Sequence, residues 1–214
     1  MKTAYDESTI GPPKIGRLLI ATQNEGKIRE FRRLISPLGL EAIALNETKH
    51  LVPPEETGAS FADNAALKAS YYARLTGQWA IADDSGLEVD ALDGAPSVRS
   101  SRFWGDGTSD KDRVLSLLKA IEASGSSDRT ARFVCVIALA NPEGEILISS
   151  EGICKGKIVE SPRGSCGFGY DPVFSPEGDE RTFAEMTAAE KDLLSHRSIA
   201  FCIFIRKFRD FMGL

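Results

Sequence analysis

The chain has 214 residues, 42% of them hydrophobic and 27% charged, enough for one globular domain or two small lobes. Its net charge of −5 provides no overall positive field to hold a nucleic-acid backbone. No segment approaches the ~20 apolar residues of a membrane span, and the first sixteen residues lack the apolar centre of a signal peptide. These features predict a cytoplasmic protein without nucleic-acid or membrane partners, with a flexible tail at 1–16 and a folded domain at 17–214.

Hydrophobic periodicity predicts alternating strands and helices. The expected elements are a strand at 17–21, a helix from 28 to about 38, a strand at 41–45, a helix at 60–76, a strand at 79–82, a helix at 110–123, a hairpin of 132–140 with 145–157, and helices opening at Thr187 and Ser195. The turn formers at 83–86 are expected to end the strand at 79–82. This mixture predicts an α/β fold with a mixed twisted sheet flanked by helices.

The cysteines and histidines argue against a zinc site. The four cysteines form no Cys-x-x-Cys pair, and only two histidines are present. Reduced, partly buried thiols are the simpler interpretation. Any essential metal is therefore expected to be a hard cation held by carboxylates and phosphate oxygens.

The segment from Thr22 to Lys27 lies between a predicted strand and an amphipathic helix. A helix N-terminus offers free backbone N–H groups and partial positive charge, which suits a phosphate. Lys27 falls in the first helical turn, where a cation opposes the helix dipole, and an anionic ligand would explain that placement. The alternative is a plain helix cap with a solvent-facing lysine, and the Walker pattern is absent.

Two adjacent acids, Asp83 and Asp84, follow the predicted strand at 79–82. Because successive side chains of a strand point to opposite faces, the two acids are expected to do different jobs. One could face a metal and a water, while the other hydrogen-bonds its surroundings. Ser85 could donate to a phosphate oxygen, and Gly86 permits a close backbone approach. A simple polar turn is the competing interpretation.

Further along the chain, helix 60–76 carries Ser60, Asn64 and Lys68 at a spacing of four, so the three share one face. This face could point a carboxamide and an ammonium into a phosphate site, or it could be solvated. Glu56, just upstream, is a candidate second carboxylate for a metal.

A glycine-rich loop and the start of the last helix complete the candidate residues. The glycines around Phe168 and Tyr170 leave the backbone free to present a ring on which a purine base would stack, although the loop could instead tuck both rings into the core. A lone histidine is more often structural, but His196, beside Lys191 and Arg197, could donate hydrogen bonds to a base. A serine–histidine hydrolase is weakly supported, because no activated nucleophile stands near His196 in the sequence.

The order and separation of these motifs resemble those of the inosine-triphosphate pyrophosphatase family, the non-canonical purine nucleoside-triphosphate pyrophosphatases, over about residues 18–197. The carrying motifs are Thr22-x-Asn24-x-x-Lys27, Glu56-Thr57-Gly58, Asp63-Asn64-Ala65, Asp83-Asp84-Ser85-Gly86-Leu87, Gly167-Phe168-Gly169-Tyr170-Asp171-Pro172 and Lys191 with Ser195-His196-Arg197. The chain departs from the family at Ser97 and Arg99, where bacterial members often have glycine and tyrosine, which puts the shape of that loop in doubt.

The resemblance implies an elongated α/β fold with two lobes, an active-site cleft between them, and a homodimer. It implies Mg²⁺-dependent hydrolysis of ITP, dITP and XTP to the monophosphate and pyrophosphate. Asp84 is then the proton acceptor and a metal ligand, and Glu56 is a second metal ligand. The implied nucleotide-binding residues are Thr22, Gln23, Asn24, Glu25, Gly26, Lys27, Lys68, Ser85, Phe168, Gly169, Tyr170, Asp171, Lys191, His196 and Arg197.

Base choice and two alternative functions stay open. Donors such as Arg197 and His196 would leave the 6-amino group of adenine unpaired, at a cost of ~1–3 kcal/mol per buried donor, which explains rejection of ATP better than rejection of GTP. A related pyrophosphatase would act on other modified nucleotides. A non-catalytic nucleotide sensor would bind ITP tightly and release no pyrophosphate.

Overall fold

The computed structural model describes residues 15–47 and 51–214, so His50 and residues 1–14 of the expected tail lie outside the described residues. Ile15, at the end of that expected tail, is buried in the core. The strands are β1 (Arg17–Ile20), β2 (Glu41–Ala44), β3 (Ala80–Val89), β4 (Thr130–Ala140), β5 (Ile146–Ile158) and β6 (Phe174–Pro176), and the helices are α1 (Glu25–Ile35), α2 (Phe61–Thr76), α3 (Asp110–Ala123), α4 (Ala188–Leu194) and α5 (His196–Met212). None of the helices in the described part of the chain is long and apolar enough to cross a membrane.

One mixed sheet with the strand order β2-β1-β3-β4-β5-β6 organises the fold. β1 is parallel to β2 and β3, whereas β3, β4, β5 and β6 pair antiparallel. β1 pairs with β3 only as far as Ile81, where β1 ends. β3 continues to Val89 alongside β4, so its second half extends past the carboxyl end of β1. In α/β sheets, ligands bind in the crevice outside such carboxyl ends.

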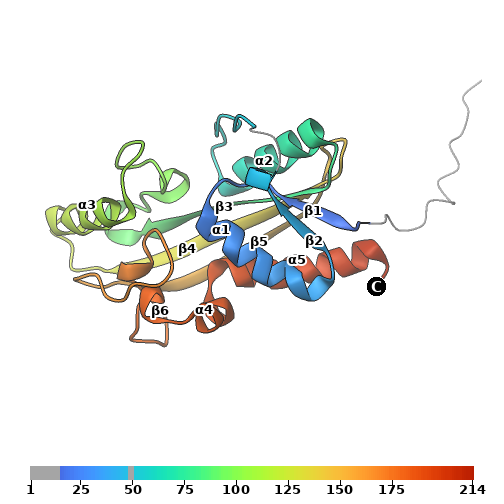
Figure 1. Cartoon of the computed structure of the whole chain (residues 1–214). Coiled ribbons are helices and arrows are strands. Elements are labelled where there is room, and N and C mark those ends of the chain that lie inside the picture. Colours follow the sequence, from blue (N-terminus) through green and yellow to red (C-terminus); the bar gives the residue numbers. More distant parts are fainter. Residues whose placement is uncertain (1–14, 48–50) are drawn as a thin grey trace, which may run out of the picture.

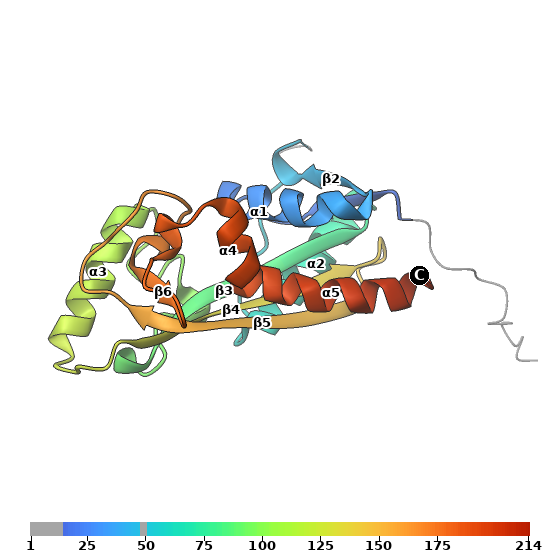
Figure 2. The same ribbon diagram turned by 90° about the horizontal axis from the view of Figure 1, so that it is seen from below.

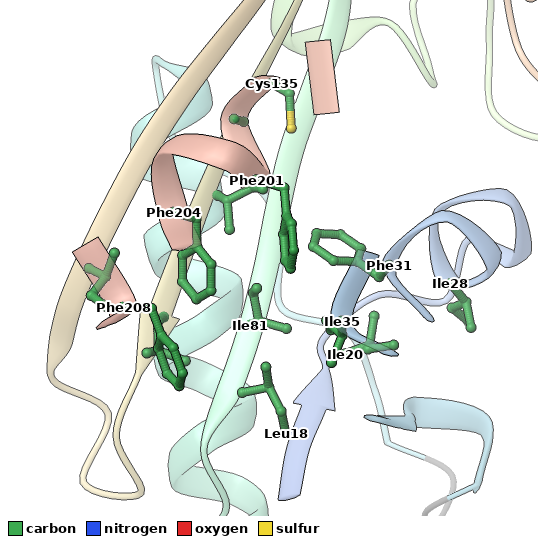
Figure 3. Packing of buried hydrophobic residues seen from close by; sticks show 14 of the residues in the cluster. Leu18, Ile20, Ile28, Phe31, Ile35, Ile81, Cys135, Phe201, Phe204 and Phe208 are labelled. Carbon is green, nitrogen blue, oxygen red and sulfur yellow. The ribbon is translucent and has the colours of Figure 1, made fainter. Parts of the chain in front are cut away.

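Helices cover both faces of the sheet. α1 and α5 pack on one face, where Phe31 of α1 meets Phe201 of α5 beside Ile81 of β3 (Figure 3). α2 packs on the other face against Ala80 and Ala82. Because side chains of a strand alternate, Asp83 continues the row that faces α1 and α5, and Asp84 continues the row that faces α2.

A third apolar cluster lies at the far end of the long strands and forms a second lobe. There α3 contributes Leu117 and Ile121, which pack with Leu87 of β3 and Phe133 of β4. Figures 1 and 2 show α3 at one end of the molecule and the C-terminal end of α5 at the other, with β3, β4 and β5 running between them. The expected elongated α/β fold with a mixed twisted sheet and two lobes is confirmed.

Most of the expected elements are confirmed, and one is wrong. Ser60 caps α2, Thr187 caps α4 and Ser195 caps α5, each by accepting a backbone N–H of the first turn. The strand expected at 79–82 does not end at residues 83–86, because β3 runs unbroken to Val89. These turn formers stay extended since each pairs with a residue of β4, and strand pairing outweighs local propensity.

The loop that departs from the family pattern packs directly against β3. Ser97 has a φ of 50°, a left-handed conformation that favours glycine, and its hydroxyl donates to Glu88 Oε1 at 3.1 Å. A Cβ at Gly86 would lie 2.3 Å from the carbonyl oxygen of Ser97 and 2.5 Å from Ser100 Oγ. Gly86 therefore lets this loop approach the strand backbone, with serine tolerated at the left-handed position.

A similar close approach joins α5 to β5 at Gly152 and supports a stability prediction. A Cβ at Gly152 would lie 2.3 Å from both His196 O and Ala200 N, which are backbone atoms of α5. Gly152→Ala is therefore expected to lower the free energy of unfolding by about 1–3 kcal/mol in urea denaturation. Gly16→Ala is the matched control, because nothing lies within 4 Å of its added Cβ. Equal unfolding midpoints for the two variants would contradict the close packing of α5 on β5.

Candidate active site

A cavity of about 580 Å³ lies between the two lobes, beside the second half of β3. Residues from both lobes and from segments far apart in the sequence line it. Of the predicted site residues, those that line the cavity are Thr22, Gln23, Asn24, Lys27, Glu56, Lys68, Asp84, Ser85, Phe168, Gly169, Tyr170, Asp171, Lys191, His196 and Arg197. The structure therefore brings nearly all of the predicted residues to one place.

The start of α1 forms one wall of this cavity. Asn24 caps the helix, with its Oδ1 accepting the backbone N–H of Lys27 at 3.1 Å, and Thr22 Oγ1 accepts the N–H of Asn24 at 3.2 Å. The Lys27 side chain is 13% exposed, and its Nζ lies 3.0 Å from Asp83 Oδ2. The helix start and the lysine thus face the cavity, and the alternative of a solvent-facing lysine is wrong.

Asp84 faces α2, where two side chains of that helix hold it. Lys68 Nζ donates to Asp84 Oδ1 at 2.7 Å, and Asn64 Nδ2 donates to Oδ2 at 3.3 Å. Burial raises the pKa of Asp84 above its ordinary value, although the charges of Lys68 and Lys27 oppose the rise. Asn64 and Lys68 are therefore turned inward, and the alternative of a solvated face is wrong for these two, whereas Ser60 is exposed.

Glu56 lies beside Asp84 and shares its lysine. Lys68 Nζ donates to Glu56 Oε1 at 2.9 Å, and Arg102 Nη1 donates to Oε2 at 2.7 Å. Arg102 also reaches the backbone oxygen of Glu56 at 3.2 Å. Burial is the largest single influence and disfavours the charged form of Glu56, but the charges and hydrogen bonds of the surrounding cations, Lys68 foremost, together outweigh burial and lower its pKa.

Asp83 points to the opposite side of β3, into a buried cluster of charges. Its Oδ2 accepts Arg197 Nε at 3.2 Å and Arg197 Nη2 at 2.9 Å, in addition to the contact with Lys27. Burial opposes ionisation of Asp83, but the charges of Lys27 and Arg197 prevail and hold its pKa far below the usual range. The prediction that the two adjacent acids do different jobs agrees with this geometry.

Glu30 connects that cluster to the glycine-rich loop. It accepts from Arg197 Nη1 and lies 2.9 Å from Lys191 Nζ. Lys191 in turn lies 2.5 Å from Asp171 Oδ2, which also accepts the backbone N–H of Phe168 at 2.9 Å. A chain of alternating charges therefore ties β3, α1 and α5 to the loop that carries Phe168.

The two aromatic residues of the glycine-rich loop differ in position. Tyr170 is buried and hydrogen-bonded, accepting from Trp104 Nε1 and donating to Ser100 O, both at 3.0 Å. Phe168 lines the cavity, with the Lys191 ammonium 4.9 Å from the centre of its ring. A Cβ at Gly26 would lie 2.4 Å from the Phe168 ring, so Gly26 leaves space for that ring. The presented ring is thus Phe168, and Tyr170 anchors the loop.

Two residues predicted to bind nucleotide, Glu25 and Gly26, are not among the residues that line the cavity. The Glu25 carboxylate accepts from Asn46 Nδ2 at 3.1 Å on the outer side of α1. Sequence reasoning also assigned no role to Glu30 and Arg102. The spacing of the sequence could have pointed to Glu30, because it lies one helical turn from Lys27 on the same face of α1. No such spacing points to Arg102, since 46 residues separate it from Glu56.

The side chains around Asp84 that could hold a metal are carboxylates, which suit a hard divalent cation. Among the described residues, no group of three histidine, cysteine or acidic side chains could hold a metal ion. Glu56 and Asp84 supply one pair of carboxylates that share the Lys68 ammonium. Mg²⁺ is commonly held by one or two carboxylates together with substrate phosphates and water. This donor set therefore fits Mg²⁺ when a phosphate ligand completes the site.

Comparison with known proteins identifies the family. The model of the Ham1 family matches residues 18–207, most of the chain. The chain belongs to the Ham1 family. It is 50% identical over 184 residues to a dITP/XTP pyrophosphatase of Synechocystis, covering 86% of this chain and 91% of that protein. It is 48% identical over 190 residues to a protein of the same name from Nostoc, covering 89% and 93%.

Solved Ham1 structures share the fold. The HAM1 protein of Coxiella burnetii superposes with a TM-score of 0.81 at 40% identity, covering 91% of this chain and 98% of that one. The Ham1 protein of Staphylococcus aureus gives a TM-score of 0.78 at 34% identity over the same shares. The architecture of this chain is therefore that of solved Ham1 proteins.

His196 supports a prediction about pH and stability in this Ham1 protein. It stacks on Phe133 with ring centres 4.6 Å apart, and its buried Nδ1 has no hydrogen-bond partner among the described residues. Burial, with the charges of Arg197 and Lys191, holds its pKa well below the ordinary value of 6.5. The unfolded chain therefore takes up a proton near that value while the folded protein does not, so stability falls as pH falls.

Wild type is expected to lose about 1.4 kcal/mol more unfolding free energy than His196→Gln between about pH 7.5 and about pH 5.5. Urea denaturation of both proteins at the two pH values measures this difference, and the variant serves as the control for all other titrating groups. Parallel losses in the two proteins would show that His196 titrates normally in the folded state.

Proposed function

We propose that this protein hydrolyses non-canonical purine nucleoside triphosphates, namely ITP, dITP and XTP, to the monophosphate and pyrophosphate. The observation that carries the proposal is a single cavity that has the Glu56–Asp84 carboxylate pair and Phe168 in its lining. A metal-bound triphosphate suits the carboxylates, and a purine base suits the ring. The relatives named dITP/XTP pyrophosphatase support this choice of substrate.

Hydrolysis at the triphosphate of the substrate depends on charge and on positioning. A nucleoside triphosphate carries close to four negative charges, and attack on phosphorus requires that they be shielded. We propose Mg²⁺ for this purpose, held by Glu56 and Asp84, where it would neutralise phosphate charge and acidify a bound water. The N-terminus of α1 and Lys27 supply further positive charge at the cavity wall.

Asp84 is the proposed proton acceptor. Its raised pKa makes it a better base than an ordinary aspartate, and its place in the cavity wall lets it meet the attacking water. Lys68 and Asn64 orient the carboxylate. Ser85 accepts from Arg197 Nη2 at 2.9 Å, which leaves its own hydroxyl proton to donate to a phosphate oxygen.

Arg197 has few free N–H groups with which to bind the purine base. Its side chain is 1% exposed, and four of its five N–H groups are directed to Asp83, Glu30 and Ser85. Arg197 can therefore offer a base one further N–H at most. Its larger contribution is to hold the buried charges that position Lys191 and Phe168.

Loss of the proposed base should slow turnover severely. Asp84→Asn keeps the size of the side chain and removes the proton acceptor, so kcat for ITP with Mg²⁺ is expected to fall at least about a hundredfold. Asp210→Asn, an exposed carboxylate near the end of α5, is the control. Near-normal turnover by Asp84→Asn would refute its role as the base.

Stacking on Phe168 should appear as a binding effect. Removing an aromatic platform costs about 1–3 kcal/mol per stacked base, so Phe168→Ala is expected to raise the KM for ITP about tenfold or more. Phe168→Tyr keeps an aromatic face and should stay near wild type. A KM for Phe168→Ala that equals the wild-type value would place the base elsewhere.

A nucleotide panel separates the proposed function from its alternatives. ITP, dITP, XTP, dUTP, ATP and methylated nucleotides are incubated with and without Mg²⁺, and the products are identified. Inosine monophosphate with pyrophosphate as the products of ITP supports the proposal. Faster turnover of dUTP or methylated nucleotides favours a related pyrophosphatase, and tight binding without products favours a sensor.

The homodimer and the cytoplasmic location stay predictions of the family resemblance.

A further inference from the structure

The carboxylate pair proposed to hold the metal is already fully engaged by the chain itself. Lys68 Nζ lies between the two acids, 2.9 Å from Glu56 Oε1 and 2.7 Å from Asp84 Oδ1. Arg102 takes the other oxygen of Glu56 at 2.7 Å, and Asn64 takes the other oxygen of Asp84 at 3.3 Å. All four carboxylate oxygens therefore have a donor from the protein, and the lysine nitrogen bridges the two acids as a divalent cation would.

We propose that Lys68 is an internal counter-ion which the metal must displace, and that the displaced ammonium is received by the phosphates of the substrate. Metal binding and nucleotide binding are then coupled, and the site takes up the metal–nucleotide complex in preference to free metal. This inference rests on the proposed function, because it takes Glu56 and Asp84 as the metal ligands.

The charges of the cluster explain why the metal and the nucleotide would bind together. Glu56 and Asp84 are balanced by Lys68 and Arg102, so the cluster is neutral. A divalent cation alone would leave an excess of positive charge around the Lys68 side chain, which is only 11% exposed. Such an excess is costly where solvent screening is weak. A metal–triphosphate complex carries net negative charge and removes the excess.

The position of Lys68 makes the exchange feasible. It lies on α2 one helical turn after Asn64, so the helix holds its backbone while a long flexible side chain carries the ammonium. The wall formed by the start of α1 lines the same cavity, which places the expected phosphate position within one enclosure with Lys68. The reaction at each step is exchange of ion pairs, with no covalent change.

Calorimetric titration of the full-length protein with Mg²⁺ or Mn²⁺, without nucleotide and with α,β-methylene-ITP, tests the coupling. Wild type is expected to bind the metal alone at least about tenfold more weakly than in the presence of the analogue. Lys68→Met removes the competing cation, so it should bind the metal alone at least about tenfold more tightly than wild type and gain less from the analogue. Equal or weaker binding of the metal alone by Lys68→Met would overturn the inference.

Two further variants calibrate this result. Arg102→Met frees one oxygen of Glu56 and is expected to tighten binding of the metal alone by a smaller factor. Lys119→Met removes an exposed lysine of α3 and should leave every constant unchanged. If Lys68→Met does not fold, wild-type thermal unfolding decides the matter: metal and analogue together should raise the melting temperature by more than the sum of their separate effects, and strictly additive shifts would overturn the coupling.

Glu56→Gln and Asp84→Asn distinguish failure of the inference from failure of the proposed function. If both variants lose analogue-dependent metal binding while Lys68→Met binds the metal alone no better than wild type, the carboxylates are the metal site and only the displacement is wrong. If both variants bind metal and analogue as wild type does, the proposed metal site falls, and the role of Lys68 falls with it.

Discussion

The alternation of side chains along an unbroken β3 is the constraint on which the site depends. Because β3 stays extended through Asp83 and Asp84, the two acids point to opposite faces of the sheet. Asp84 meets α2 with Lys68, and Asp83 meets α1 and α5 with Lys27 and Arg197. Since β1 ends beside Ile81, the cavity opens along this stretch of β3. A shift of one residue in the register would exchange the two acids and disconnect both clusters.

Burial of so many ionised groups is tolerable only because their charges alternate. Glu30 lies between Arg197 and Lys191, and Asp171 holds Lys191 from its other side. An unpaired charge at any of these positions would lose its solvation without compensation. The same alternation that stabilises the cluster also fixes the loop that presents Phe168, because Asp171 accepts the backbone N–H of that residue. The stability of the fold and the proposed binding of the base therefore depend on the same set of ion pairs.

The individual motifs gave ambiguous predictions that tertiary contacts resolved. Lys27 and Lys68 could each have been solvated lysines, and both instead lie in ion pairs inside one cavity. Tyr170 had the same sequence environment as Phe168 but is anchored by Trp104 and Ser100. The role of Arg102 cannot be predicted from the sequence, because Glu56, its partner among the described residues of the site, is distant in the sequence. Spacing within one helix can be read from sequence, whereas a contact across lobes cannot.

The sequence by itself determined the order of the elements except the short strand β6, the helix caps at Ser60, Thr187 and Ser195, and the set of polar residues suited to a phosphate and a metal. Periodicity and capping are local, so they survive without knowledge of the fold. Only the tertiary structure decided that β3 continues through its turn formers and that Lys68 bridges Glu56 and Asp84. Those outcomes depend on pairing with β4 and on the approach of α2, which are non-local interactions that outweigh local preference.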